Sequence, residues 1–414
     1  MNTYCSVSST SAAQILGAVA TALFRRDAST ERGGYSKNRG RIWLSALLGC
    51  TAAFSTSFAA NTGASKAKPL VQIGILLDTS NSMDGLIEQA KGQLWKICNE
   101  FIKAKQKGVA PEVQVALYEY GKSSLLGESG WIRRIQPLTT DLDKISEELF
   151  ALKTNGGDEF CGWVIKDAVN ELEWSPRSDV YKVIFIAGNE PFTQGPVNYA
   201  EACKAAISKG IIVNTIHCGT EAEGIDGKWK EGATIADGKY LVIDHNRAVV
   251  SIEAPQDKEI ARLGEDLNKT YVAFGSAGRA GAERQKGQDA NAAALAPASG
   301  AVVQRAIAKA SANYQNSSWD LVDAAKDAKF EVSELKSEEL PAEMQKMNAA
   351  ERKTFIDKKA KERTELQAKI QKLTAVRDQY VAQRTKEAAT GDTLDAAVIS
   401  AVREQGAKRN LVFK

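Results

Sequence analysis

The organisation of this chain follows from one stretch, VQIGILLDTSNSM at residues 71–83. An apolar run ends there at the carboxylate of Asp78, and the hydroxyls of Ser80 and Ser82 follow at alternate positions. A continuous apolar run of this length is typical of a strand that is buried on both faces of a sheet. Because open parallel sheets bind ligands outside the carboxyl ends of their strands, we expect these three side chains to lie at the functional edge.

Strand and helix patterns alternate on either side of this stretch and after it. A polar linker is predicted at 61–69, and Pro137 marks one of the later segments as an edge strand. The alternation predicts βαβ units, and hence a doubly wound, mostly parallel α/β sheet over residues 70–275. The other predicted strands are 113–120, 131–138, 181–187, 211–217 and 240–244, and the predicted helices are 86–107, 141–152, 161–172, 197–209 and 256–273.

The composition changes beyond the α/β pattern. Residues 276–330 are predicted as a linker and a helical segment, and residues 331–414 as a charged helical region. Apolar residues recur at helical spacing in the latter, which predicts a long amphipathic helix or a short coiled coil. Arg363 and Arg377 fall at inward-facing positions of this pattern and interrupt the heptad.

Residues 1–60 are predicted as an N-terminal extension that contains a signal peptide at about 37–59. Basic residues precede an apolar centre there, and the small residues Ser57 and Ala59 supply a cleavage site. The protein is therefore expected to be exported, either to the periplasm or out of the cell. Two alternatives stay open: a lipoprotein anchored through Cys50, which ends the run LLGC, and a retained membrane anchor.

Composition limits the remaining classes of function. The chain of 414 residues is long enough for two or more modules, and its net charge of +3 is too small to predict nucleic acid binding. With only His217 and His245, a histidine-rich metal site is excluded. The cysteines lack zinc-site spacing, so buried free thiols are expected, with one disulfide left open for an exported protein. Four cysteines lie inside the apolar elements, namely Cys98, Cys161, Cys203 and Cys218.

The pattern Asp78-x-Ser80-x-Ser82 after a buried strand resembles the metal-ion-dependent adhesion site of von Willebrand factor type A (VWA) domains. The resemblance covers residues 70–275 and implies a bound divalent cation, Mg²⁺ or else Mn²⁺ or Ca²⁺. Oxygen ligands of this kind suit a hard cation. The alternative interpretation is that Ser80 and Ser82 only cap the helix that follows.

The second and third ligand loops of that family carry over unevenly. In the second loop Gly156-Gly157 matches, but Asp158 stands where a threonine is usual, and Thr154 is a weaker substitute. In the third loop Gly188 stands where an aspartate is usual. We expect the carboxylate gained in one loop to offset the one lost in the other. The expected ligands are thus Asp78, Ser80, Ser82 and Asp158, with Glu159 and Glu190 at the rim.

The resemblance implies binding rather than catalysis. In VWA domains a carboxylate of the partner often completes the metal coordination, so we expect a protein or peptide partner that binds through an acidic group. No nucleotide-binding motif predicts a small-molecule cofactor. One alternative is an assembly protein with a degenerate metal site that acts through 331–414, where self-association is expected. A metal-dependent hydrolase is less favoured, because Ser80 stands where a phosphatase of the haloacid-dehalogenase kind needs its second carboxylate.

Overall fold

The computed structural model describes residues 67–243, 251–387 and 394–413. The expected signal peptide at 37–59, with Cys50 and its alternative anchor, lies outside the described residues, and so does His245. Among the helices that are described, none is both long and apolar enough to span a bilayer.

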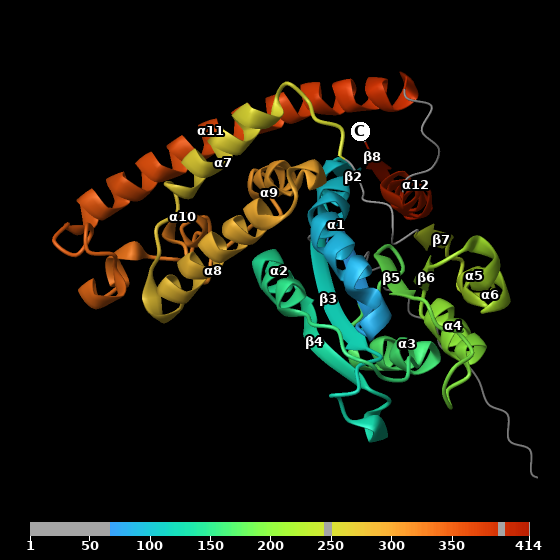
Figure 1. The fold of residues 1–414 in the computed structure, drawn as a ribbon. Coiled ribbons are helices and arrows are strands. Elements are labelled where there is room, and N and C mark those ends of the chain that lie inside the picture. Colours follow the sequence, from blue (N-terminus) through green and yellow to red (C-terminus); the bar gives the residue numbers. More distant parts are fainter. Residues whose placement is uncertain (1–66, 244–250, 388–393, 414) are drawn as a thin grey trace, which may run out of the picture. The chain divides into compact units, whose positions relative to one another are not determined.

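A six-stranded sheet forms the centre of the α/β part (Figure 1). Its strands lie in the order β4-β3-β1-β5-β6-β7, and all neighbours are parallel except the antiparallel pair β3 and β4. The predicted doubly wound, mostly parallel sheet is therefore confirmed, and the strand with Pro137 is at the edge. The strands are β1 Leu70–Asp78, β3 Glu112–Tyr120, β4 Ile132–Thr139, β5 Tyr181–Gly188, β6 Ile211–Cys218 and β7 Tyr240–Ile243.

Helices cover both faces of this sheet. Side chains of β1 alternate between two apolar clusters, so that Leu77 packs with α1 and α2 while Leu76 packs with α3 and α4. Because β1 is also hydrogen-bonded on both edges, only its carboxyl end is left to carry chemistry. The helices of this part are α1 Asp84–Lys103, α2 Leu142–Ala151, α3 Cys161–Glu171, α4 Tyr199–Ser208, α5 Glu221–Asp226 and α6 Trp229–Ile235, with the 3₁₀ turns η1 Asn81–Met83 and η2 Gly127–Ser129.

The helical region is built around a helix of 39 residues, α11, which runs along α7 (Figure 1). The two arginines that interrupt its heptad are buried and ion-paired within the chain. Arg363 binds Asp320 at 2.6 Å and Asp323 at 3.1 Å, and Arg377 binds Asp257 at 2.6 Å. The other elements are α7 Asp257–Asn268, α8 Gly275–Ala294, η3 Pro297–Ser299, α9 Ala301–Lys309, α10 Leu321–Ala324, η4 Val332–Glu334, η5 Ser337–Glu339 and α11 Ala349–Glu387.

The C-terminal segment returns to the α/β part, which the sequence did not predict. Helix α12 Leu394–Ala407 packs against α1 and β7, and β8 Leu411–Phe413 pairs antiparallel with β2 Ala104–Gln106. Helix α1 consequently ends at Lys103 rather than at the predicted 107, because the next residues form β2.

One side chain anchors this return in the core. Gln405 is 1% exposed and exchanges two hydrogen bonds with the amide of Asn214, at 2.7 and 3.1 Å. The hydroxyl of Tyr181 donates to the same Gln405 side chain at 2.8 Å. The neighbouring Glu404 is exposed and pairs with Lys239 at the surface.

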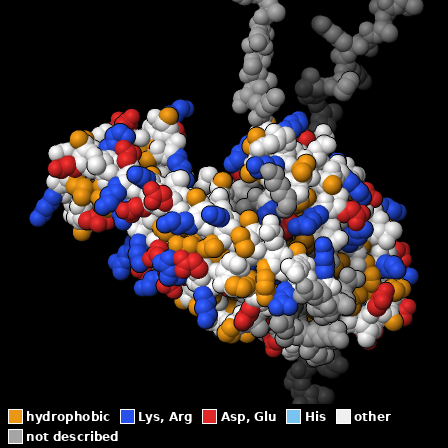
Figure 2. All heavy atoms as spheres, turned by 90° about the horizontal axis from the view of Figure 1, so that it is seen from above, with side chains coloured by type: hydrophobic (Ala, Val, Ile, Leu, Met, Phe, Trp, Pro, Cys, Tyr) orange, Lys and Arg blue, Asp and Glu red, His pale blue; other side chains and the backbone are white. Residues whose placement is uncertain are grey.

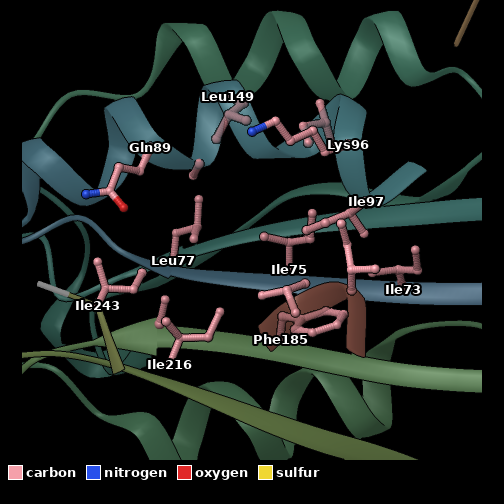
Figure 3. A pocket seen from close by; sticks show the side chains of 15 residues that line it. Ile73, Ile75, Leu77, Gln89, Lys96, Ile97, Leu149, Phe185, Ile216 and Ile243 are labelled. Atoms are coloured by element: carbon pink, nitrogen blue, oxygen red, sulfur yellow. The ribbon is translucent and has the colours of Figure 1, made fainter. Parts of the chain in front are cut away.

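A small apolar cavity of about 70 Å³ lies between the sheet, α1 and α12 (Figure 3). Ile73, Ile75 and Leu77 of β1 point into it from the sheet, facing Ile97 of α1. The returning helix thus covers the sheet face without filling it completely.

The outer surface carries both signs of charge. On the face seen in Figure 2, Lys and Arg side chains are interspersed with Asp and Glu, and apolar side chains lie between them. This distribution agrees with the small net charge of +3.

Replacing Gln405 with Ala tests the anchoring role. We expect Gln405→Ala to lower the free energy of unfolding by about 2–4 kcal/mol, because the buried groups of Asn214 and Tyr181 lose their partner. Glu404→Ala, one residue away and exposed, is the control and should cost at most about 0.5 kcal/mol. Urea unfolding followed by circular dichroism measures both, and equal losses would refute the anchoring role.

Candidate metal centre

The carboxylate of Asp78 lies at the carboxyl end of β1 and is fully buried. Its Oδ1 accepts a hydrogen bond from the backbone N–H of Ser80 at 2.7 Å. Its Oδ2 is buried and has no hydrogen-bond partner among the described residues. A buried carboxylate oxygen without a partner is costly, so this atom marks a place where a positive group is missing.

The two serine hydroxyls converge beside this carboxylate. Ser80 is 3% exposed, and its Oγ lies 3.1 Å from the Oγ of Ser82. The hydroxyl of Ser82 also donates to Oδ1 of Asn189 at 3.2 Å. Ser80 precedes η1 but makes no capping hydrogen bond with its side chain, so the interpretation that the serines only cap a helix is wrong.

The second loop brings Glu159, the residue next to the expected ligand, against Asp78. Glu159 is 6% exposed, whereas Asp158 is exposed. A Cβ atom built on Gly121 would lie 2.7 Å from the Cγ methylene of Glu159 and 2.8 Å from Oδ1 of Asp78, so the two side chains lie against the same glycine. The hydroxyl of Ser80 and the charge of Asp78 both act on the pKa of the Glu159 carboxyl, which places that carboxyl near the other two groups. The weaker candidate, Thr154, instead donates its hydroxyl to the carboxylate of Asp84.

The third loop has no room for the aspartate that the resemblance leads one to expect. A Cβ atom at Gly188 would lie 2.6 Å from the hydroxyl of Tyr120 and 3.1 Å from Oδ2 of Asp78. Tyr120 is fully buried and donates its hydroxyl to the carbonyl of Ala187 at 2.9 Å. The tyrosine therefore takes the space that a third-loop side chain would need.

The site is rich in negative charge and lacks a counter-ion. Burial, and to a smaller degree the charge of Glu190, raise the pKa of Asp78 to about 7. Burial and the charges of Asp78 and Glu190 raise the pKa of Glu159 to about 8. Among the described residues no lysine or arginine forms an ion pair with Asp78 or Glu159.

The donor set fits a hard divalent cation. The Asp78 carboxylate, which has one oxygen without a partner, lies near the serine hydroxyls and the Glu159 carboxyl. Oxygen ligands of this number leave positions for water or a partner group. Within the part of the chain that is described, no three His, Cys, Asp or Glu side chains form a metal-binding group by themselves. A metal site here would draw on other oxygen atoms as well, and the hydroxyls of Ser80 and Ser82 are candidates for them.

The other chemically active side chains near this edge of the sheet are buried. Both ring nitrogens of His217 are buried without a hydrogen-bond partner, and burial lowers its pKa. Burial raises the pKa of the Cys161 thiol far above its ordinary value, which argues against a reactive thiolate beside the second loop. The four cysteines of the described residues are buried free thiols, as predicted.

The sheet has the strand arrangement that the sequence predicted. It has a central strand that ends in Asp78-x-Ser80-x-Ser82, parallel neighbours and an antiparallel edge strand. The α/β part of this chain has a VWA-like fold.

Three solved structures illustrate what part of this chain is similar to. BatB from Bacteroides thetaiotaomicron is 20% identical, with 42% of this chain and 90% of that chain covered and a TM-score of 0.32. Proximal thread matrix protein 1 from the mussel byssus, with a zinc-occupied MIDAS motif, is 15% identical over 44% of this chain and 43% of that one, with a TM-score of 0.34. The von Willebrand factor domain of the type V pili tip protein Mfa5 from Porphyromonas gingivalis is 13% identical over 42% and 90%, with a TM-score of 0.32. No family model and no curated protein matches the chain.

A pair of substitutions tests the steric account of the third loop. Gly188→Ala should cost about 1–3 kcal/mol of stability, because its methyl group meets the hydroxyl of Tyr120. Adding Tyr120→Phe removes that hydroxyl, so the double variant should recover about 1 kcal/mol relative to the sum of the single effects. Additive losses in a double-mutant cycle would contradict the account.

The raised pKa values predict an unusual pH dependence of the metal-free protein. The folded state holds protons on Asp78 and Glu159 more tightly than the unfolded state, so their contribution to stability is present below about pH 4 and is lost as the pH rises through 7–8. In chelator, the VWA-like part should lose on the order of 2–4 kcal/mol over this range, and Asp78→Asn should flatten the profile. Urea unfolding between pH 5 and 8 measures it. Asp158→Asn, at an exposed position, is the matched control, and a wild-type slope in Asp78→Asn would rule out this origin.

Proposed function

We propose that the VWA-like part binds a divalent metal ion, Mg²⁺ or Mn²⁺, through Asp78, Ser80, Ser82 and Glu159. The observation that carries this proposal is the buried Oδ2 of Asp78, which has no partner among the described residues although the hydroxyl of Ser80 and the carboxyl of Glu159 lie near the Asp78 side chain. A divalent cation at this point satisfies that oxygen and neutralises the repulsion between the carboxylates. Asp158, the carboxylate expected from the sequence, is then a rim group that attracts the cation or hydrogen-bonds its water.

The bound ion would serve as an anchor for a partner. The residues that would hold it come from the end of β1 and from loops that are hydrogen-bonded to each other, and a partner group could complete the coordination there. An acidic side chain of a protein or peptide is the group that such a cation binds best. We infer an exported binding protein of the cell envelope, with export resting on the predicted signal peptide at 37–59.

The structure gives less support to the two alternative functions. The buried seam of α11 contacts α7, α9 and α10 of the same chain, so the metal centre rather than the tail carries our proposal. A hydrolase of the phosphatase kind would need a general acid two residues after Asp78, and the side chain there is the hydroxyl of Ser80.

Isothermal titration calorimetry with Mg²⁺ and Mn²⁺ tests the metal site. Since the pKa values of Asp78 and Glu159 are raised, binding at pH 7 should release about one proton, and affinity should rise from pH 6 to pH 8. The number of protons released is obtained by repeating the titration in buffers of different ionisation enthalpy and comparing the binding heats. Binding that is independent of pH would be inconsistent with these ligands.

Neighbouring variants identify the second carboxylate. Asp78→Asn should abolish binding, and Glu159→Gln should weaken it at least about tenfold, whereas Asp158→Asn should change it by less than about threefold. If Asp158→Asn weakens metal binding more than Glu159→Gln does, Asp158 rather than Glu159 is the second carboxylate ligand. Capture of envelope proteins on the immobilised wild-type chain, in Mg²⁺ and in chelator, then tests the partner, with Asp78→Asn as the inactive control.

A further inference from the structure

A second cavity, of about 690 Å³, opens at the opposite end of the sheet from the metal centre. It lies at the amino ends of β5 and β6, beside the last residues of α3 and α4 and the loop 172–180. Arg409, which follows α12 in the returning C-terminal segment, completes its wall. We refer to this space as the amino-edge cavity. Its volume is in the range of small-molecule binding sites.

The amino-edge cavity is lined by four cationic side chains, of which only one is neutralised. Arg177 forms a two-pronged ion pair with Asp179, at 2.9 and 3.0 Å. The other three cations are Lys182, Lys209 and Arg409, and none of them forms an ion pair within the described ranges.

The two lysines are held in place by neutral oxygens. Lys182 is 6% exposed, and its ammonium donates to the carbonyls of Ser175, at 3.0 Å, and of Lys209. The ammonium of Lys209 donates to the carbonyl of Val169 and to Oδ1 of Asn170, both at 3.0 Å. A carbonyl oxygen offsets part of an ammonium charge but does not cancel it. The buried ammonium of Lys182 therefore still favours an anion nearby.

Gly210 leaves a gap between two of these cations. The residue has a positive φ of 70° and no side chain, and a Cβ atom placed on it would lie 3.8 Å from Nζ of Lys182 and 3.9 Å from Nη2 of Arg409. Burial, together with the charge of Arg409, lowers the pKa of Lys182, as expected for two like charges that face each other without a counter-ion.

Two features oppose an anion here, and neither removes the gap. Glu173 lines the same cavity and is exposed, and it forms no ion pair with the cations. The carbonyl ends of α3 and α4 point their partial negative charge toward the cavity, but the ammonium groups of Lys182 and Lys209 already bind carbonyls there.

We propose that the amino-edge cavity binds a small ligand through an oxyanion, a carboxylate or a phosphate, which sits above Gly210 between Lys182 and Arg409. The oxyanion supplies the counter-charge that both cations lack and accepts hydrogen bonds from the free donors of the guanidinium and the ammonium. The indole of Trp174 and the hydroxyl of Ser208 form the remaining wall against which the body of the ligand packs. This site does not depend on the metal centre, because it lies at the other edge of the sheet.

Titration of the full chain with inorganic phosphate and with acetate, at constant ionic strength set by chloride, tests this site. We expect at least one of the two anions to saturate, with a rise in Tm of about 2 °C at ten times its Kd and shifts of the Gly210 and Arg409 amide signals in NMR spectra. Saturation by phosphate alone identifies a phosphate ligand, and saturation by acetate alone identifies a carboxylate ligand. If neither anion saturates, the proposal fails.

Variants place the anion between the two cations. Arg409→Gln should weaken the binding at least about tenfold, while Lys408→Gln, an exposed neighbour with the same loss of charge, should leave it within about twofold. Equal effects of the two variants would mean that the anion is attracted only by the general positive charge of this region, and the proposed site would be wrong.

A matched pair at Gly210 gives a test that needs no ligand. Asp and Asn both tolerate a positive φ, so Gly210→Asp and Gly210→Asn differ mainly in charge. The Asp variant places a carboxylate in the gap, so it should melt at least about 2 °C above the Asn variant and no longer respond to phosphate or acetate. In the Arg409→Gln background that difference should shrink. An Asp variant that is no more stable than the Asn variant would contradict the proposal.

Discussion

The whole molecule is constrained by the burial of its central strand. β1 is hydrogen-bonded to β3 and β5, and apolar clusters cover both of its faces, so the chain leaves the sheet at Asp78 with the side chain of this residue fully buried. A charged group in that position needs a partner of opposite sign. The chain surrounds it instead with hydroxyls and with Glu159 and Glu190, which repel it. The cation site that we propose thus follows from how the central strand ends.

The departures from the VWA ligand pattern have a common cause in packing. Tyr120 ends the neighbouring strand β3, and its hydroxyl reaches the carbonyl of Ala187 across the end of β1. That hydroxyl occupies the space over Gly188, so a third-loop carboxylate is sterically excluded. The second loop compensates by turning Glu159 inward against Asp78. The proposed site therefore has two carboxylates, as in the VWA pattern, but the second one comes from the second loop instead of the third.

Buried polar contacts tie the C-terminal half to the α/β part, in addition to the apolar residues that it adds to the core. Arg305 of α9 binds Asp143 of α2 at 2.6 Å, and Gln405 of α12 joins the core amides beneath β6. Buried polar pairs of this kind are costly when one member is removed, which makes the arrangement specific. The same return of the chain brings Arg409 to the amino edge of the sheet. The helical region therefore contributes residues to the α/β part as well as covering it.

The sequence alone predicted the strands of the central sheet, their alternation with helices, the edge position of the strand with Pro137, and Asp78, Ser80 and Ser82 as candidate ligands at the end of the central strand. These features depend on local periodicity and on residues a few positions apart, which a pattern records directly. Only the tertiary structure showed that Asp158 is exposed and Glu159 is buried, because the direction of the loop backbone turns one carboxylate outward and its neighbour inward, and our choice of Glu159 as a ligand rests on this difference. It also decided that Arg363 and Arg377 are partners of distant aspartates rather than faults in a coiled coil, and that residues 394–413 complete the α/β part. Those outcomes rest on contacts between residues tens to hundreds of positions apart, whose energies no local pattern contains.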